Sequence, residues 1–383
     1  MVFGLVDTDI AGVQIRNTAV ILSRHSVQFD EGAVGAYRFQ VHWPQEWRVA
    51  KMMESQILAM LRKYVGLLRT EKERVSFAER RVRGLLLIAP YSVVERLMYI
   101  RQQRPPRMTV DGTTEDGIHL RCQIGDVISM SVYLFGTWEP DLSEFMRRRL
   151  RPGDTFIDVG ANIGYMSALA SRIVGPDGAV VAIEPEPATG AALQETVAMN
   201  DLTNIRLVAA AASDRDGELP LFVGPSHWHG FTSTVAPQGL KEQDPRALLQ
   251  EHGSVRAGPL GSLLTREELA AARLIKIDVE GAEDRVLAGI VASVDALPAD
   301  TELVVEMIPT SWGDQHQQLR PIDVLQPFLE RGFHVCLLPA VYSPRRRLWP
   351  RDVGMAQRVR DLSVLERRER LDVVLSRSDA DAL

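Results

Sequence analysis

Glycines and polar side chains gather in residues 155–165, where a predicted strand runs directly into a predicted helix. The segment from Asp158 to Gly164 reads Asp-Val-Gly-Ala-Asn-Ile-Gly. Gly160 and Gly164 let a ligand approach the backbone closely, and the N–H groups at a helix start attract a carboxylate. Asp158, which ends the strand, can accept a hydrogen bond from an ammonium group, directly or through water. The segment therefore predicts a site for a ligand with an amino-acid tail.

A second carboxylate, Glu184, ends the next predicted strand. A carboxylate at this position can accept hydrogen bonds from both hydroxyls of a ribose, as it does in dinucleotide-binding folds. The dinucleotide fingerprint is Gly-x-Gly-x-x-Gly, however, whereas Asn162 stands at the second glycine position of this loop. These residues favour S-adenosylmethionine as the ligand and disfavour the nicotinamide dinucleotide of an oxidoreductase.

Three ionisable residues lie in and after a further apolar strand, at Lys276, Asp278 and Glu280. Side chains alternate along a strand, so all three are expected on one side, at a strand end that lines the active site. Burying three such groups without partners would be costly, which supports a functional site. The alternative is that Lys276 and Glu280 simply pair across the strand end.

Short apolar segments alternate with helical patterns through the second half of the chain. The predicted strands are Thr155–Gly160, Ala179–Pro185, Ile205–Ala212, Leu274–Val279, Leu303–Ile308 and Phe333–Pro339, and residues 372–376 could add an edge strand. The predicted helices are Ile163–Val174, Ala188–Met199, Ala282–Val291 and Ile322–Arg331. Strands that are apolar on both faces and separated by helices predict a parallel sheet covered on both sides.

The first part of the chain has a different pattern. Residues 1–47 are expected to be irregular or strand-like, whereas residues 48–102 have helical patterns that end before Pro105-Pro106. We therefore expect an N-terminal region at 1–106 and a catalytic domain at 107–383, with a hairpin near 108–122 and an insertion at about 214–264. Apolar residues recur at spacings of four and three along the first predicted helix and form one apolar seam: Met53, Ile57, Met60, Tyr64 and Leu67. This seam could support a homodimer or pack on the chain's own core.

Charge and cysteine content limit the classes of function. Residues 1–110 carry 17 Lys and Arg against 10 Asp and Glu, whereas residues 111–383 carry 27 against 40. An acidic catalytic part disfavours nucleic acid as the substrate. Cys122 and Cys336 lie far apart without a Cys-x-x-Cys pair, and neither a leader nor a long apolar run is evident. A cytoplasmic protein without a membrane span is expected.

An ordered series of motifs extends over about residues 110–340. The motifs are Phe135 to Pro140, Leu150 to Tyr165, Val180 to Pro187, Ala210 to Asp214 and Ile275 to Glu283. In this series the chain resembles the FkbM-type methyltransferases. The resemblance implies a class I, Rossmann-like α/β fold with a mostly parallel seven-stranded sheet and helices on both faces. The largely helical N-terminal appendage is expected from the residue pattern alone, because the resemblance does not extend to it. The resemblance also implies S-adenosylmethionine as donor, and adds Glu139, Tyr165 and Ser213 to the cofactor-binding residues already named.

The same resemblance implies O-methylation of a hydroxyl on a sugar, a glycolipid or a polyketide-type natural product. An S-adenosylmethionine-binding interaction protein without turnover, or an N- or carboxyl-methyltransferase, are the alternatives. The segment 226–230 departs from the small residues expected there, and its histidines and the strand-end carboxylates are the candidate bases: His227, His229, Asp278 and Glu280. Magnesium held by Asp278 and Glu306 is considered and not favoured, and His227 and His229 lack a third metal ligand.

Overall fold

The computed structural model describes residues 109–123, 126–224, 232–237, 248–312, 319–339 and 354–383, together with the N-terminal segments named next. The chain divides into two compact units, residues 1–64 and residues 65–383. The predicted boundary between residues 106 and 107 lies outside the described residues and stays a prediction.

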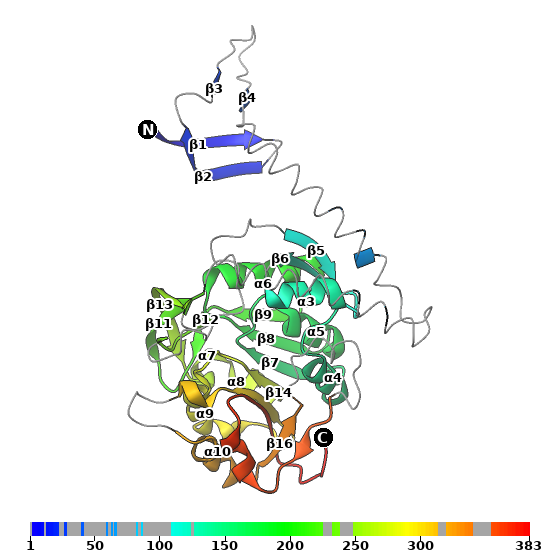
Figure 1. Ribbon diagram of the computed structural model, residues 1–383. Coiled ribbons are helices and arrows are strands. Elements are labelled where there is room, and N and C mark those ends of the chain that lie inside the picture. Colours follow the sequence, from blue (N-terminus) through cyan, green and yellow to red (C-terminus); the bar gives the residue numbers. More distant parts are fainter. Residues whose placement is uncertain are drawn as a thin grey trace. The chain divides into compact units, whose positions relative to one another are not determined.

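The N-terminal unit begins with β-strands. Strand β1 (Val2–Ile10) pairs antiparallel with β2 (Val13–Leu22), and β3 (Val27–Gln28) pairs with β4 (Gln40–Val41) (Figure 1). The first two strands are rich in β-branched residues, which favour an extended backbone. These strands agree with the strand-like interpretation of residues 1–47, and the helices expected at 48–102 lie mostly outside the described residues. Helical positions are described at 59, 63, 65, 66, 82 and 86, and the five seam residues lie outside the described part.

The larger unit is built on an eight-stranded mixed sheet with the order β17-β16-β18-β15-β14-β7-β8-β9. Its strands are β7 (Thr155–Val159), β8 (Ala179–Ile183), β9 (Ile205–Val208), β14 (Ala272–Ile277), β15 (Glu302–Met307), β16 (His334–Leu338), β17 (Gln357–Arg358) and β18 (Leu371–Ser376). The five neighbours from β15 to β9 are parallel, as predicted. Their carboxyl ends therefore meet at one edge of the sheet.

Two details of the sheet correct the sequence prediction. Strand β18 is antiparallel and lies between β15 and β16, so it is an interior strand and not an edge strand. Its residues Val373 to Leu375 are fully buried, which an interior position explains. The two-residue strand β17 pairs with β16 and makes eight strands where seven were expected.

Helices cover both faces of this sheet. They are α3 (Val127–Phe135), α4 (Pro140–Arg149), α5 (Tyr165–Val174), α6 (Pro187–Met199), α7 (Leu260–Leu263), α8 (Arg266–Ala270), α9 (Glu283–Val291) and α10 (Pro321–Leu329), with short 3₁₀ helices at Val294–Ala296, Pro309–Ser311 and Leu362–Arg367. Ile157 of β7 belongs to the apolar core under α9 and α10. The next residue, Asp158, accepts a hydrogen bond from Ser167 of α5, which places α5 on the opposite face.

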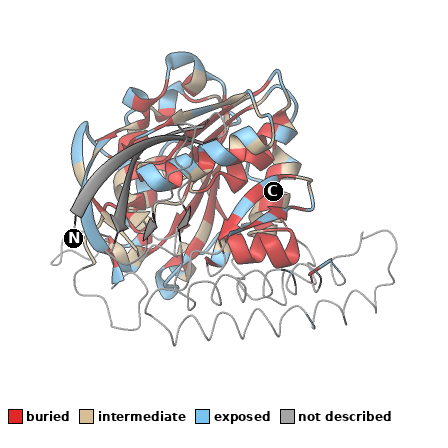
Figure 2. Ribbon diagram, turned by 90° about the horizontal axis from the view of Figure 1, so that it is seen from above, coloured by how far each residue is buried: buried red, intermediate tan, exposed pale blue. Residues whose placement is uncertain are grey.

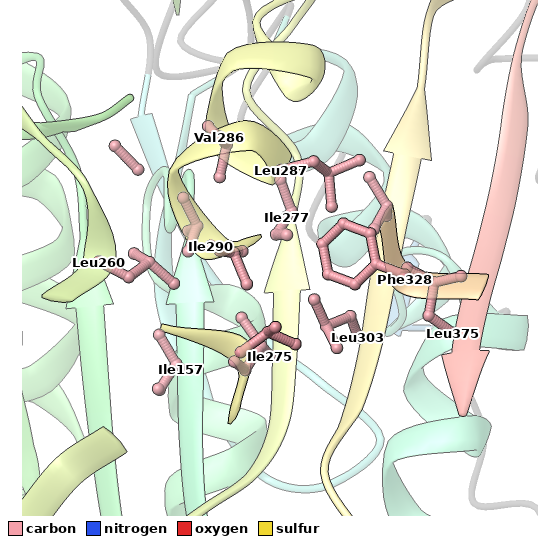
Figure 3. Packing of buried hydrophobic residues seen from close by; sticks show 14 of the residues in the cluster. Ile157, Leu260, Ile275, Ile277, Val286, Leu287, Ile290, Leu303, Phe328 and Leu375 are labelled. Carbon is pink, nitrogen blue, oxygen red and sulfur yellow. The ribbon is translucent and has the colours of Figure 1, made fainter. Parts of the chain in front are cut away.

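The main core packs α9 and α10 onto β14, β15 and β18. Figure 3 shows Leu287 and Ile290 of α9 beside Ile277, with Phe328 of α10 close to Leu303. Figure 2 shows the strands mostly buried, between helices that also carry exposed residues. Burying these apolar side chains stabilises the strands that end at the site. The gain is about 25 cal/mol for each Å² of apolar surface removed from water. None of the described helices has the length and apolar character that crossing a membrane requires.

The predicted hairpin and insertion are both present. Strands β5 (Thr109–Thr113) and β6 (His119–Gln123) pair antiparallel, as expected near residues 108–122. The insertion forms a second sheet of β10 (Ala211–Ala212), β13 (Gln250–Gly258), β11 (Gly217–Val223) and β12 (Thr232–Ser233). Because β10 follows β9 directly, this sheet begins at the carboxyl-end edge of the main sheet.

Candidate functional site

A cavity opens at the carboxyl ends of the parallel strands. It encloses about 750 Å³ of space, part of it open to solvent. Its lining comes from the ends of β7, β8, β14 and β15 and from the insertion: Ile128, Trp138, Glu139, Val159, Gly160, Asn162, Ile183, Glu184, Pro185, Ala210, Ala211, Ala212, Thr232, Ser233, Thr234, Asp278, Val279, Glu280, Glu306 and Arg370. This edge of an open α/β sheet is where ligands bind in such folds.

The turn after β7 depends on a glycine at position 160. Gly160 has φ +80°, and a Cβ atom there would lie 1.8 Å from the carbonyl oxygen of Asp278. The backbone N–H groups of Gly160 and Ala161 both donate to the carbonyl of Ile183, at 3.0 and 3.1 Å. The glycine therefore allows the ends of β7, β8 and β14 to approach one another, and leaves a backbone surface facing the cavity.

Glu184 and Asn162 form the second part of the site. Glu184 Oε2 accepts the backbone N–H of Asn162 at 2.9 Å, and Oε1 accepts that of Glu186 at 2.9 Å. Burial raises the pKa of Glu184 to about 7, against the opposing effect of these two backbone donors. Each carboxylate oxygen accepts more than one hydrogen bond. Glu184 can therefore bind a ribose diol while it holds the loop.

Backbone strain concentrates in this cavity. Four non-glycine residues in the described part of the chain have a positive φ, and three of them line the cavity: Glu139, Asn162 and Glu280. A left-handed conformation costs such residues about 1–3 kcal/mol, and strain of this kind is typical of functional sites. Asn162 lowers the cost because asparagine tolerates this region, and its own Oδ1 accepts the N–H of Ile163 at 2.7 Å.

A buried ion cluster lies behind the cavity wall. Lys276 Nζ lies 3.3 Å from both Asp158 Oδ1 and Asp278 Oδ2, and donates to the Gly160 carbonyl at 3.1 Å. Burial raises the pKa of Asp158, and Lys276 and Ser167 oppose this rise. The alternative in which Lys276 pairs with Glu280 is not what the structure shows. Lys276 pairs instead with the two aspartates.

Carboxylates dominate the opposite end of the cavity. Oxygen atoms of Asp278, Glu280 and Glu306 lie within 4.8 Å of one another, which is close enough to share a metal ion. Arg370 forms an ion pair with Glu306. Just behind them, burial and the nearby charge of Glu139 raise the pKa of Asp372 to about 8. Carboxylates therefore outnumber basic side chains among the lining residues that the structure describes.

The residues present fit S-adenosylmethionine. The backbone turn at Gly160, called the Gly160 cradle below, lines the same cavity as the buried Glu184 carboxylate. A backbone surface next to a ribose-binding carboxylate suits a nucleoside with an amino-acid tail.

Comparison with known proteins agrees with this geometry. Residues 158–335 match the family described as the methyltransferase FkbM domain. This segment is similar to FkbM-type methyltransferase domains. The resemblance seen in the sequence is confirmed, and S-adenosylmethionine is the cofactor that this family of methyltransferases assigns to the site.

Two curated relatives and one solved structure are similar over parts of the chain. The 31-O-demethyl-FK506 methyltransferase FkbM of Streptomyces tacrolimicus is 31% identical over 160 residues, which are 37% of this chain and 61% of the relative. The methyltransferase sdnD of Sordaria araneosa is 29% identical over 217 residues, 50% of this chain and 79% of the relative. A crystal structure of a methyltransferase FkbM from Methylobacillus flagellatus has 13% identity and a TM-score of 0.34, and the match covers 64% of this chain and 52% of that one. The chain thus spans about three fifths of the Streptomyces relative.

The cavity brings together only some of the site residues predicted from the sequence. The predicted residues that line the cavity are Glu139, Gly160, Asn162, Glu184, Asp278 and Glu280. The predicted base His229, together with His227, lies outside the described residues. Asp158 is fully buried and does not line the cavity, because its carboxylate neutralises Lys276 and accepts from Ser167. A direct contact between Asp158 and the ligand's ammonium is therefore not supported.

Three more predicted cofactor-binding residues pack the scaffold and do not line the cavity. Gly164 lets α5 approach α6, since a Cβ there would lie 2.9 Å from Leu193. The Tyr165 hydroxyl lies 3.3 Å from Thr137 Oγ1 and 3.3 Å from Ser143 Oγ, and so joins α5 to α4. Ser213 is buried, with its Oγ bonded to Asp214 at 3.0 Å.

Several lining residues were not predicted from the sequence. Ala210 to Ala212 lie immediately before the predicted Ser213, at the same strand end. Thr232 to Thr234 come from the insertion, whose path has no sequence signal. Arg370 precedes β18, and only the insertion of that strand beside β15 brings it to Glu306.

Proposed function

We propose that this protein is an S-adenosylmethionine-dependent O-methyltransferase that methylates a hydroxyl of a sugar, a glycolipid or a polyketide-type natural product. The observation that carries the proposal is the placement of Glu184 and the Gly160 cradle in one cavity of an FkbM-type domain. The name of the Streptomyces relative, which refers to an O-demethyl compound, supports an oxygen acceptor.

The donor end of the cavity has a lining residue or segment for each part of the cofactor. Glu184 binds the ribose hydroxyls, the Gly160 turn receives the amino-acid tail, and Ala210 to Ala212 leave an apolar slot for the adenine. When bound, S-adenosylmethionine supplies an electrophilic methyl group on a sulfonium. The chain then has to hold an acceptor oxygen in line and remove its proton, and alignment provides most of the rate effect.

The charge of the acceptor end favours a hydroxyl over a carboxylate. Glu139, Asp278, Glu280 and Glu306 line it, and Arg370 is the basic residue among the lining side chains. An anionic acceptor would be repelled by this excess of carboxylates, whereas a hydroxyl can donate a hydrogen bond to one of them. The geometry thus disfavours the carboxyl-methyltransferase alternative. An amine would also be attracted here, so the acceptor test includes amines.

We assign proton removal to a strand-end carboxylate. Asp278 is held by Lys276, whereas Glu280 sits on a strained turn whose carbonyl accepts from Ser233 Oγ at 2.9 Å. A positioned base contributes about 10²–10⁴-fold to such a step. Glu280→Gln and Asp278→Asn are compared with His229→Ala at matched donor saturation. The variant that lowers kcat by at least about a hundredfold identifies the base, and unchanged rates in both carboxylate variants contradict the assignment.

We propose that the reaction proceeds without a metal ion. Asp278, Glu280 and Glu306 lie close enough to bind magnesium, but Arg370 already neutralises Glu306. A cluster of carboxylates binds magnesium best when no basic side chain already neutralises its negative charge. Full activity after exhaustive chelation is expected. Loss of activity that magnesium restores would show that the cluster is a metal site.

The acceptor is tested by transfer of a labelled methyl group. Purified protein and labelled S-adenosylmethionine are incubated with separate panels of sugars and polyols, hydroxylated macrolides, amines and carboxylic acids. Label in a hydroxylated panel, stable to mild base, supports the proposal. Label confined to amines or to base-labile esters supports N- or carboxyl-methylation. Tight cofactor binding without transfer to any panel supports the interaction-protein alternative.

A further inference from the structure

Lys276 lies within β14 and is buried, with 5% of its surface exposed. Burying an ammonium ion is costly unless its charge is matched and its N–H groups are bonded. Asp158, Asp278 and the Gly160 carbonyl provide partners at 3.3, 3.3 and 3.1 Å. The contact with the Gly160 carbonyl is a hydrogen bond and the two aspartate contacts are ion pairs, so two carboxylates match the buried charge.

The partners of Lys276 connect the hidden part of the site to its exposed wall. Asp158 belongs to β7 and is fully buried, whereas Gly160 and Asp278 line the cavity. Lys276 itself is not among the residues that line this cavity. Its ammonium thus lies behind the wall and bonds two residues of the wall. Lys276 lines a small neighbouring pocket instead, so it can act on a ligand in the main cavity by holding these two wall residues in place.

The backbone around these residues leaves little room for adjustment. The Asp278 N–H donates to the Val159 carbonyl at 3.0 Å, and the Asp278 carbonyl lies where a Cβ of residue 160 would be. A shift of the Asp278 backbone would therefore move the glycine turn, and a shift of the turn would move Asp278. A single side chain that contacts both the glycine turn and Asp278 can therefore fix the methyl-donor end of the cavity relative to the acceptor end.

We propose that Lys276 is a positioning residue of the methyl-transfer site, which fixes the Gly160 carbonyl and the Asp278 carboxylate together, with Asp158 as its buried counter-charge. This inference rests on the function proposed above. In this role Lys276, the lysine of the Lys-x-Asp-x-Glu pattern, acts without contacting the cofactor. Lys276→Met keeps the apolar stem and its packing but removes the charge, so the variant tests the effect of the charge alone.

The charges that face Lys276 determine what its loss does. They are Asp158 from β7, Asp278 after β14, Glu139 before α4 and, farther away, Glu184 after β8. All are carboxylates, so without the ammonium they repel one another and one of them takes up a proton at a higher pH than before. A protonated wall carboxyl is a poorer acceptor for the cofactor. The defect of Lys276→Met is therefore larger at low pH than at high pH, where only the loss of positioning remains.

The experiment is calorimetric titration of the full chain with S-adenosylhomocysteine at about pH 6.5 and about pH 8.5. Relative to the wild type at the same pH, Lys276→Met is expected to bind about a hundredfold more weakly at the lower pH and about tenfold more weakly at the higher, where the loss of positioning remains. Lys276→Arg, which keeps the charge, is expected to show the same ratio to the wild type at both values. A Lys276→Met ratio that is equal at both pH values, whether near one or large, overturns the proposal.

A second variant covers failure to fold. If Lys276→Met does not unfold cooperatively, the titrations are made on Asp158→Asn/Lys276→Met, which removes both buried charges and leaves no unpaired ion. This double variant is expected to bind at least about tenfold more weakly than the wild type at both pH values, because nothing holds Asp278. Wild-type affinity in it overturns the proposal. A wild type that fails to bind S-adenosylhomocysteine contradicts the proposed function instead, so the two failures are distinguishable.

Discussion

The carboxylate of Glu184 accepts the backbone N–H of Asn162 at 2.9 Å, across the gap between the ends of β8 and β7. The residue that stands in place of the dinucleotide glycine is therefore held by the residue assigned to the ribose. One ligand-binding carboxylate thus also sets the shape of the loop beside it, and the first predictions follow from this arrangement.

Removing the Glu184 carboxylate is expected to weaken cofactor binding. Glu184→Ala loses charged hydrogen bonds to the ribose, and S-adenosylhomocysteine should bind more weakly by about 1–3 kcal/mol in a calorimetric titration. Glu195→Ala is the control, because Glu195 is an exposed carboxylate of α6 that pairs with Arg121 and does not line the cavity. Equal affinity in Glu184→Ala and the control would remove Glu184 from the ribose role.

Cofactor affinity is expected to depend on pH around neutrality. Burial raises the pKa of Glu184 to about 7 in the unliganded protein, so a growing fraction is protonated below that pH and accepts ribose hydroxyls less well. S-adenosylhomocysteine should bind more tightly as the pH rises through 7, and Glu184→Gln should flatten this dependence. An equally steep dependence in Glu184→Gln would assign it to another group.

The same shift predicts how Glu184 affects stability. Because its pKa in the fold lies above the ordinary value of 4.5, its contribution is fully present below pH 4.5 and is lost as the pH rises through 7. Denaturant unfolding of the unliganded protein across this window is expected to show a smaller decline in Glu184→Gln than in the wild type. Identical declines would contradict the assignment.

The glycine turn offers a matched pair of substitutions. Gly160 and Gly153 both have positive φ, but a Cβ at 160 would lie 1.8 Å from the Asp278 carbonyl, whereas nothing lies within 4 Å at 153. Gly153→Ala should cost about 1–2 kcal/mol of unfolding free energy from backbone strain alone and leave cofactor affinity unchanged. Gly160→Ala should cost more and abolish binding measured by calorimetry. Similar results for the two variants would show that close approach at Gly160 is not needed.

A buried hydrogen bond holds the turn that carries Glu280. Trp312 Nε1 donates to Glu283 Oε2 at 2.8 Å, and Glu283 Oε1 accepts the Gly281 N–H at 2.7 Å. Trp312→Phe leaves one of these carboxylate oxygens without its donor, which should lower the free energy of unfolding by about 1–3 kcal/mol in denaturant titrations. An unchanged unfolding midpoint would show that water replaces the indole.

Much of the sheet could be predicted because its signal is local. Segments such as Thr155–Val159 and Glu302–Met307 are buried on both faces, so their apolar runs mark parallel strands directly. The position of β18 could not be predicted, since an apolar strand near the end of the chain fits an edge as well as an interior place. The strand pairs with β15 and β16, which lie elsewhere in the sequence, and this pairing brings Arg370 to the site.

The site itself was predicted unevenly for a similar reason. The ends of the strands and the turns that follow them can be located from the sequence. These turns carry Gly160, Asn162 and Glu184. Asp158 lies on the same strand as the turn, and only its contact with Lys276 on β14 shows that it is a buried counter-charge. Such side-chain partners across strands leave no pattern in one sequence.

The most direct test of the proposed function is a calorimetric titration of the purified full chain with S-adenosylhomocysteine and, separately, with NADH. Glu184, Asn162 and the Gly160 cradle predict saturable binding of S-adenosylhomocysteine with a dissociation constant of about micromolar order and no binding of NADH. Binding of NADH alone, or of neither compound, would contradict the assignment of this cavity to S-adenosylmethionine.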